Sequence, residues 1–118
     1  METEAIPFAC NINAIEPDQR QQHLATALEV FQAVETIQQL PNGYAFRLPN
    51  ETRLLLKAAE FIANERRCCP FFGFTVLIEP DGGAMWLHLT GHEGVKPFIQ
   101  AEIGEALNER VARAANFR

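Results

Sequence analysis

The chain has 118 residues, of which 47% are hydrophobic and 21% are charged, and this composition is ordinary for a soluble globular protein. The length suits a single domain, so we expect residues 1–118 to share one core. The net charge of −5 and the pI near 5.1 argue against the basic surface that nucleic-acid binding requires.

The N-terminus, "METEAIPFAC", is acidic and lacks the basic segment and long apolar run of a signal peptide. No apolar stretch approaches the roughly 18 residues that a membrane span needs. We therefore expect a cytoplasmic protein without a membrane partner. The odd number of cysteines, three, does not resemble the disulfide framework of a secreted protein, so reduced thiols are expected.

The first predicted elements are a strand and a helix. In "FACNINAI" (8–15), Phe8, Cys10 and Ile12 alternate with asparagines, which is typical of a half-buried strand with Cys10 toward the core. The segment 18–31 then predicts an amphipathic helix. Its apolar positions are at helical spacing: Leu24, Ala27, Leu28 and Phe31. His23, beside them, is interpreted as a surface or boundary histidine.

A hairpin and a second helix follow. Residues 34–40 and 44–48 flank "PNG", whose Asn-Gly pair favours a tight turn, and Tyr44, Phe46 and Leu48 share one strand face. The helix 51–69 is predicted to bury four apolar side chains: Leu55, Ala58, Ala59 and Ile62. Pro70 disfavours helical geometry at Cys69, so this helix should end at about the cysteines.

The last third predicts a second hairpin and a final helix. Residues 71–79 and 84–90 flank the turn "PDGG", with Trp86 and His88 opposite an apolar face. The final helix has apolar residues at spacings of three and four, namely Val95, Phe98, Ile99, Ile103, Ala106, Leu107 and Val111. Thr90 and Glu93 stand in capping-box positions before it.

These elements predict an α+β, two-layer fold with an antiparallel sheet of about five strands and three helices, in the order βαββαββα. The two ββα segments resemble each other, since their turns begin 39 residues apart, at Pro41 and Pro80. A duplicated ββα unit is therefore a candidate origin for the fold.

The stretch "NERRCCPFFGF" carries the candidate site. On a helix, Glu65 is a neighbour of both Cys68 and Cys69, because residues three and four apart share a face. The negative helix C-terminus raises thiol pKa, whereas Arg66 and Arg67 would attract a thiolate. Nucleophilic activation therefore has weak support, and we do not expect an enzyme. Metal capture makes less demand on thiol acidity, because a soft cation itself drives deprotonation.

A soft metal or metalloid ion is the ligand that these residues favour. Cys68 and Cys69 would bind it, Cys10 would be the third sulfur and Glu65 a supporting carboxylate. Arsenite or mercury suits two or three sulfurs, while zinc would need a fourth ligand from water, Glu65 or a histidine.

Three alternatives stay open. The cysteines are equally explained as small apolar core residues, and a redox pair is a further interpretation. Alternatively, the groove between the two ββα halves binds a small ligand or a second copy of the chain, as a homodimer, without metal. Tyr44, Trp86 and His88 would line that surface.

"ERRCCPFFGF" and "LTGHEGVKPFI" together resemble a family of small bacterial proteins of about this length. Similar members run from a strand with a cysteine, through "DGYAFRLP"-like and "ERxCCPF"-like segments, to an "LTGxEGVKxF"-like helix start. The cysteine turn also resembles a C-terminal segment of some regulators of the mercury-resistance type. The small proteins have no assigned activity, so the resemblance implies at most a heavy-metal association for Cys10, Glu65, Cys68 and Cys69.

Overall fold

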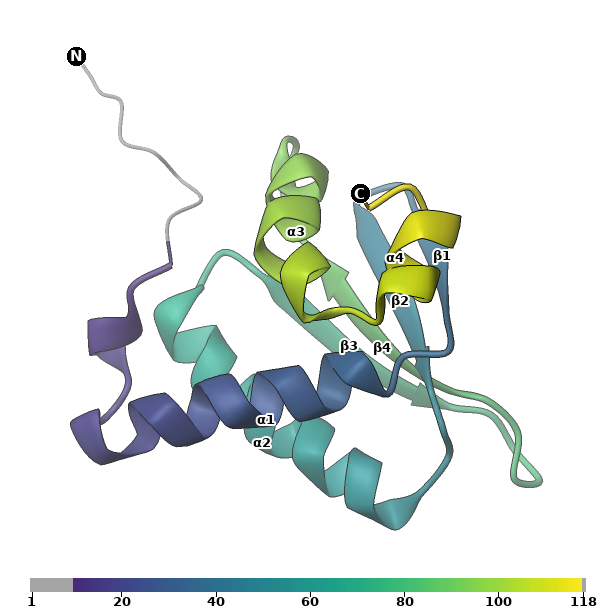
Figure 1. Cartoon of the computed structure of the whole chain (residues 1–118), viewed down its shortest axis with the longest axis horizontal. Coiled ribbons are helices and arrows are strands. Elements are labelled where there is room, and N and C mark those ends of the chain that lie inside the picture. Colours follow the sequence, from purple (N-terminus) through teal and green to yellow (C-terminus); the bar gives the residue numbers. More distant parts are fainter. Residues whose placement is uncertain (1–9, 118) are drawn as a thin grey trace.

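The computed structural model describes residues 10–117. A four-stranded antiparallel sheet carries the helices on one face (Figure 1), which confirms the α+β class with two layers. The described residues hold four strands and four α-helices rather than about five strands and three helices. None of the helices within 10–117 is long and apolar enough to cross a membrane.

Both predicted hairpins are present. The strands are β1 (Thr36–Leu40), β2 (Gly43–Leu48), β3 (Gly73–Ile78) and β4 (Met85–Thr90). Their order in the sheet is β1-β2-β4-β3, and all three pairings are antiparallel. The two hairpins therefore meet through β2 and β4, an arrangement that a duplicated ββα unit would give. Gly43 is required at this seam, because a Cβ atom there would collide with the carbonyl oxygen of Leu89.

The helices are α1 (Arg20–Gln32), α2 (Thr52–Cys68), α3 (Val95–Ile103) and α4 (Glu109–Ala114), with 3₁₀ turns η1 (Ile12–Ala14), η2 (Pro17–Gln19) and η3 (Gly104–Ala106). Helix α2 ends at Cys68, two residues before Pro70, as predicted. It runs beside α1 over the sheet (Figure 1).

The core lies between the helices and the inner face of the sheet. That face consists of Tyr44, Phe46, Leu48, Met85, Leu87 and Leu89, all buried. Phe31 of α1 is the link between the layers, since its ring meets Phe46 at 5.3 Å and Phe61 of α2 at 5.2 Å, both edge to face. The aromatic contacts thus fix α1 and α2 over the centre of the sheet.

The predicted first strand, 8–15, is wrong over its described part, residues 10–15; Phe8 and Ala9 lie outside the described residues. Asn11 makes a turn instead, because its side chain accepts a hydrogen bond of 3.1 Å from the backbone N–H of Asn13. The backbone N–H of Asn11 donates to the carbonyl of Cys68 at 2.8 Å. The segment is therefore attached to the end of α2 and not to the sheet.

The predicted final helix is broken in two. Helix α3 starts at Val95 after Gly94, whose φ is 94°, and Thr90 ends β4, so the predicted capping box is absent. After η3, Leu107 is extended, and the side chain of Asn108 accepts a hydrogen bond from the N–H of Arg110 to begin α4. The predicted single helix is therefore divided into α3 and α4, although its apolar residues keep helical spacing throughout.

Helix α1 buries a face that overlaps the predicted one only in part: Phe31 is buried and Ala27 half-buried, as predicted, but the two leucines are not. Leu24 and Leu28 are 62% and 50% exposed, whereas His23, Thr26 and Val30 are buried. Polar contacts to α2 explain this rotation: Thr26 donates to Glu60 at 2.9 Å, and His23 contacts a buried carboxylate of α2. These bonds outweigh the apolar pattern of the leucines.

The buried face of α2 is also displaced from the predicted one. Ala58 is buried as predicted, but Leu55 and Ile62 are only half-buried and Ala59 is exposed. The buried stripe has helical spacing and consists of Leu54, Ala58, Phe61, Glu65 and Cys68. This stripe leads directly to the cysteines.

Candidate thiol site at the end of helix α2

The last turns of α2 place an acid and a thiol in the protein interior. Glu65 and Cys68 belong to the buried stripe of the helix, and each is 4% exposed. Cys69 has left the helix, with φ −127° and ψ 70°, and its N–H still donates to the carbonyl of Glu65 at 2.7 Å. Because the backbone leaves the helix between Cys68 and Cys69, the two side chains do not diverge as neighbours within a helix would.

Cys10 forms a disulfide with Cys69, with their Cα atoms 4.7 Å apart. The expectation of three reduced thiols is thus wrong for this structure. The hydrogen bond from Asn11 to the carbonyl of Cys68 places the preceding residue, Cys10, beside the turn after α2. Cys68 remains a free thiol.

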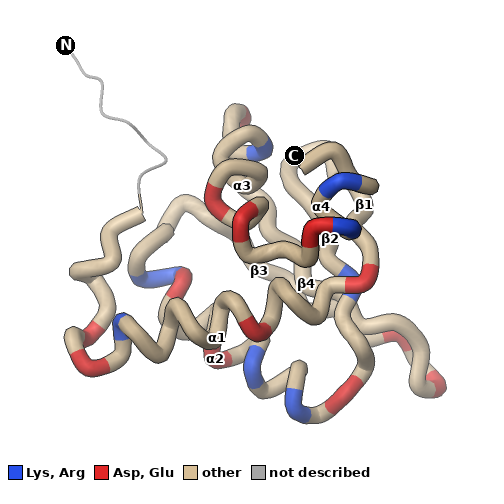
Figure 2. Tube along the Cα trace, in the orientation of Figure 1, with Lys and Arg blue, Asp and Glu red and all other residues tan. Residues whose placement is uncertain are grey.

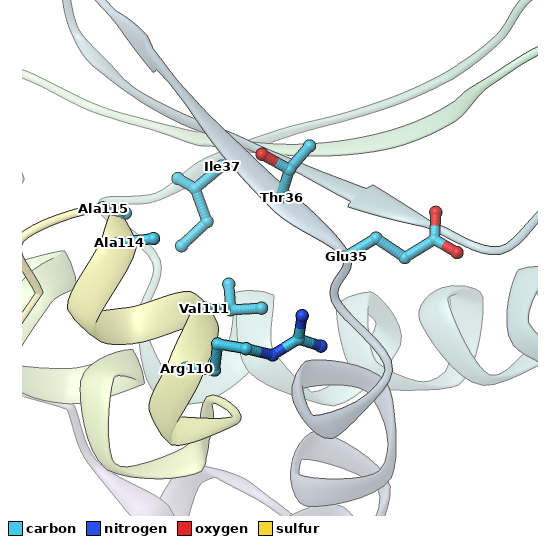
Figure 3. Close-up of a pocket in the computed structure, with 7 residues that line it drawn as sticks. All are labelled: Glu35, Thr36, Ile37, Arg110, Val111, Ala114 and Ala115. Atoms are coloured by element: carbon cyan, nitrogen blue, oxygen red, sulfur yellow. The ribbon is translucent and has the colours of Figure 1, made fainter.

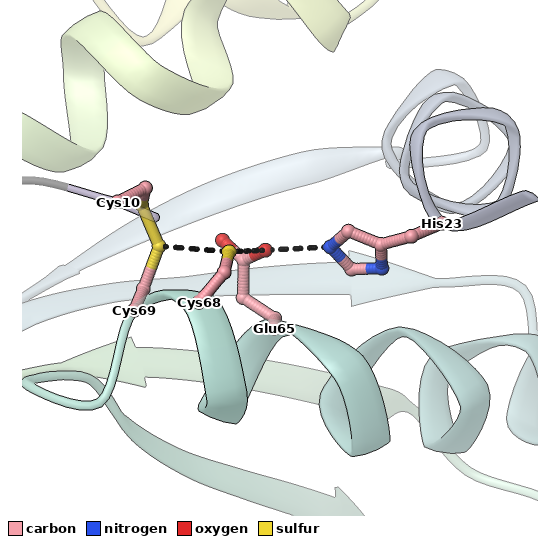
Figure 4. Close-up of a disulfide and its surroundings, with 5 residues drawn as sticks. All are labelled: Cys10, His23, Glu65, Cys68 and Cys69. Carbon is pink, nitrogen blue, oxygen red and sulfur yellow. Dashed lines mark hydrogen bonds and ion pairs between the residues drawn. A yellow bond between two sulfur atoms is a disulfide. The ribbon is translucent and has the colours of Figure 1, made fainter. Parts of the chain in front are cut away.

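The free thiol lies directly beside the disulfide (Figure 4). The Sγ of Cys68 is 3.5 Å from the Sγ of Cys69 and 3.6 Å from Oε1 of Glu65. One ligand atom each from Cys10, Glu65, Cys68 and Cys69 lies within 4.8 Å of the others. The fold therefore brings together all four residues singled out in the sequence.

His23 is a fifth member of the cluster, so its interpretation as a surface or boundary histidine is wrong. It is 2% exposed, its ring stacks on Phe61 with centroids 5.6 Å apart, and its Nε2 is 2.8 Å from Oε1 of Glu65 (Figure 4). Its Nδ1 is buried and has no hydrogen-bond partner among the described residues. We assign a proton to Nε2, because the carboxylate is an acceptor and Nε2 donates to it. Glu65 thus accepts from an imidazole and a thiol.

The surroundings keep the thiol of Cys68 protonated. Burial raises its pKa to about 12, and the negative charge of Glu65, the hydrogen bond to Glu65 and the charge of Glu102 act in the same direction. Arg66 and Arg67 do not lower the pKa of Cys68, although the sequence suggested that they would attract its thiolate. Both side chains are exposed, and Arg67 pairs with Glu16 at 3.5 Å. This environment therefore stabilises the thiol of Cys68 and does not stabilise a thiolate nucleophile.

A cavity of about 620 Å³ opens over the thiol, between α1 and the end of α3 with η3. We call it the α1–η3 groove. Leu24, Ala27 and Leu28 of α1 form one wall, and Ile103 and Ala106 form the other. The floor holds Phe31, Phe61, His23, Glu65 and Cys68, while Cys10 and Ile12 close one end. The candidate thiol site is thus the polar floor of a mainly apolar groove.

Two further acids line this groove, Glu102 and Glu105. Burial raises the pKa of the Glu102 carboxyl, and the charge of Glu65 adds to this, while His23 acts in the opposite direction. The sequence offered no signal for Glu102, because only the packing of η3 against α1 brings the end of α3 near Glu65.

A second cavity, of about 140 Å³, lies between β1 and α4 (Figure 3). Apolar side chains, among them Ile37 and Val111, line it together with Glu35, Thr36 and Arg110. Its lining residues include neither cysteine nor histidine, so it offers no set of soft-metal ligands.

The alternative ligand surface, made of Tyr44, Trp86 and His88, forms only in part: Trp86 and His88 line a cavity of about 240 Å³, but Tyr44 lies on the opposite face of the sheet. Tyr44 pairs with Leu89 and faces the helices, where it is 4% exposed and packs against Phe117 at 4.7 Å. Trp86 and His88 lie on the other face of the sheet, and Trp86 is only 9% exposed. Because alternate residues of a strand point to opposite faces, the three side chains cannot line one groove.

Neither the family models, nor the curated proteins, nor the solved structures compared with this chain include one that matches it. The resemblance to small bacterial proteins with an ERxCCPF turn therefore stays a prediction. The chemistry of the site therefore follows from its own residues.

Proposed function

We propose that the protein binds a soft metal or metalloid ion through Cys10, Cys68 and Cys69 once the disulfide is reduced. The carrying observation is the convergence of three sulfurs and one carboxylate within 4.8 Å. Sulfurs that share an ion with bonds of about 2.3 Å lie at most roughly 4 Å apart in a trigonal arrangement. Only small movements of the side chains are then needed to enclose an ion.

The donor set selects the class of ion. Thiolates are the preferred ligands of soft ions, and three of them match the three bonds of trivalent arsenic. Zinc is a poorer match, because a tetrahedral site would need a fourth donor and the nearest one, Glu65, already accepts hydrogen bonds from His23 and Cys68. In the reaction with arsenite, three S–As bonds form, three As–O bonds break and the thiol protons leave in three waters. The high pKa of Cys68 is overcome because the ion replaces the proton.

Glu65 and His23 hold the site in shape. The carboxylate accepts a hydrogen bond from Cys68 before binding, and His23 fixes the orientation of that carboxylate. The carboxylate can relay the proton of Cys68 to a hydroxyl group of the arsenic, which then leaves as water. Glu65 and His23 thus position the ligand Cys68. We propose a binding protein rather than an enzyme.

We further propose a cytoplasmic location, where reductants keep most disulfides open. There the dithiol form of Cys10 and Cys69 would dominate, and Cys68 would complete the site. The heavy-metal association implied by the resemblance points the same way. In an oxidising environment the disulfide would instead block two of the three sulfurs.

Isothermal titration of the reduced protein with arsenite tests the proposal. We expect one ion per chain, and we expect Cys10→Ser, Cys68→Ser and Cys69→Ser each to weaken binding at least about 100-fold, since each removes one of three bonds. The oxidised protein is the matched control and should not bind arsenite. If reduced wild type bound no arsenite while circular dichroism showed it folded, the cysteines would be core residues and nothing more.

A further inference from the structure

The α1–η3 groove is far larger than a bare ion needs. Its volume is about 620 Å³, whereas a cavity of roughly 150 Å³ already accommodates a benzene ring. Leu24 and Leu28 leave 62% and 50% of their surfaces exposed on its rim. A contiguous exposed apolar surface beside a polar floor is typical of a site for an organic ligand.

The charges of the groove favour a cation. Three acidic side chains line it, namely Glu65, Glu102 and Glu105; its one histidine, His23, pairs with Glu65, and none of the described residues that line it is lysine or arginine. Figure 2 shows acidic residues along α3 and the turn that follows it. An apolar anion would be repelled there, while a cation with an apolar body would match both walls and charges.

The oxidised protein offers this cation one sulfur. With Cys10 and Cys69 joined, Cys68 is the free thiol of the described chain, and it lines the groove floor. One thiolate is too few for a bare mercury or arsenic ion that seeks two or three sulfurs. It suffices for a metal that already carries a carbon ligand, because linear mercury takes only one more bond.

We propose that the disulfide form binds a mono-organic mercury cation, with the metal on the Sγ of Cys68 and the organic group in the α1–η3 groove. The inference rests on the proposed function in so far as both use the thiol of Cys68, but it concerns the oxidised state. In the step, an S–Hg bond forms and the bond from mercury to its halide or hydroxide breaks. The thiol proton leaves with the hydroxide as water, or the proton and the halide both leave to solvent, and no atom changes its oxidation state.

Intact-mass measurement of the oxidised protein with phenylmercury and methylmercury tests this inference. We expect a one-to-one adduct that Cys68→Ser abolishes. Iodide, which binds mercury without reducing the disulfide, should remove phenylmercury only at a concentration at least about tenfold higher than it needs for methylmercury, because the ring gains apolar contacts in the groove. Equal iodide concentrations for the two compounds would overturn the inference.

Substitutions on the groove rim supply the second arm. Leu28→Gln should lower the ratio of the iodide concentrations that remove phenylmercury and methylmercury at least about fivefold. Leu56→Gln changes a leucine of α2 that is 64% exposed, and it should leave this ratio unchanged. Both variants should bind arsenite normally when reduced, which separates this inference from the proposed function. If the ratio in Leu28→Gln equalled that of the wild type, the phenyl ring would lie outside the groove.

Discussion

Reduction of the Cys10–Cys69 disulfide should lower the free energy of unfolding by about 4 kcal/mol, because the bond closes a loop with a sequence separation of 59. The disulfide also attaches the segment before α1 to the turn after α2. Since small domains have a stability of roughly 5–15 kcal/mol, most of the reduced chain should stay folded and able to bind an ion. Urea unfolding with and without reductant measures the difference.

The variant Cys10→Ser is the control for this measurement. It cannot form the disulfide, so its unfolding midpoint should match that of the reduced wild type and should not respond to reductant. Coincident unfolding curves for oxidised and reduced wild type would contradict the role given to this bond.

Alkylation of Cys68 in the oxidised protein should be about 1000-fold slower at pH 8 than that of an ordinary thiol. With a pKa of about 12 in place of 9.0, the thiolate fraction falls from roughly one in ten to one in 10⁴. Because only the thiolate reacts, the rate should rise about tenfold per pH unit and should not level off near pH 9. Iodoacetamide labelling followed by mass spectrometry gives the rate.

The same experiment separates the causes of the shift. Glu65→Gln removes the charge and the hydrogen-bonded carboxylate beside the thiol, so alkylation should become at least about tenfold faster at pH 8. Glu105→Gln is the matched control, because Glu105 lines the groove but is not among the causes of the raised pKa. Equal acceleration by both variants would mean that groove opening, and not Glu65, controls the reaction.

Local signals in the sequence were sufficient for the hairpins and for the end of α2. Pro41 and Asn42 form the first β-turn, since Leu40 pairs with Gly43, and the second contains Asp81 and Gly82, where φ is positive. Pro70 then fixes where α2 ends. Such signals act within a few residues and do not depend on the rest of the fold.

The faces of the helices could not be predicted in this way. The leucines of α1 have a regular spacing, yet the contacts of Thr26 with Glu60 and of His23 with Glu65 turn them outward. The sequence separation of His23 and Glu65 is 42 residues, so no local pattern joins them. A buried polar pair between helices therefore outweighed the apolar pattern.

For the candidate site, helical spacing was enough to link Glu65 with the cysteines. The convergence of Cys10 with them is confirmed by the geometry, but its pairing with Cys69 in a disulfide was not predicted. Sequence alone does not distinguish Cys68 from Cys69 as the partner, and the odd cysteine count favoured reduced thiols. The groove could not be predicted from the sequence, because it depends on how α1 packs against η3 at the end of α3.

X-ray absorption of arsenic bound to the reduced protein tests the central claim most directly, because it counts the sulfur neighbours of the metalloid. If Cys10, Cys68 and Cys69 form one site, the arsenic has three sulfur neighbours in the wild type and two in Cys10→Ser. Two sulfurs or fewer in the wild type, unchanged by Cys10→Ser, would contradict a three-sulfur site.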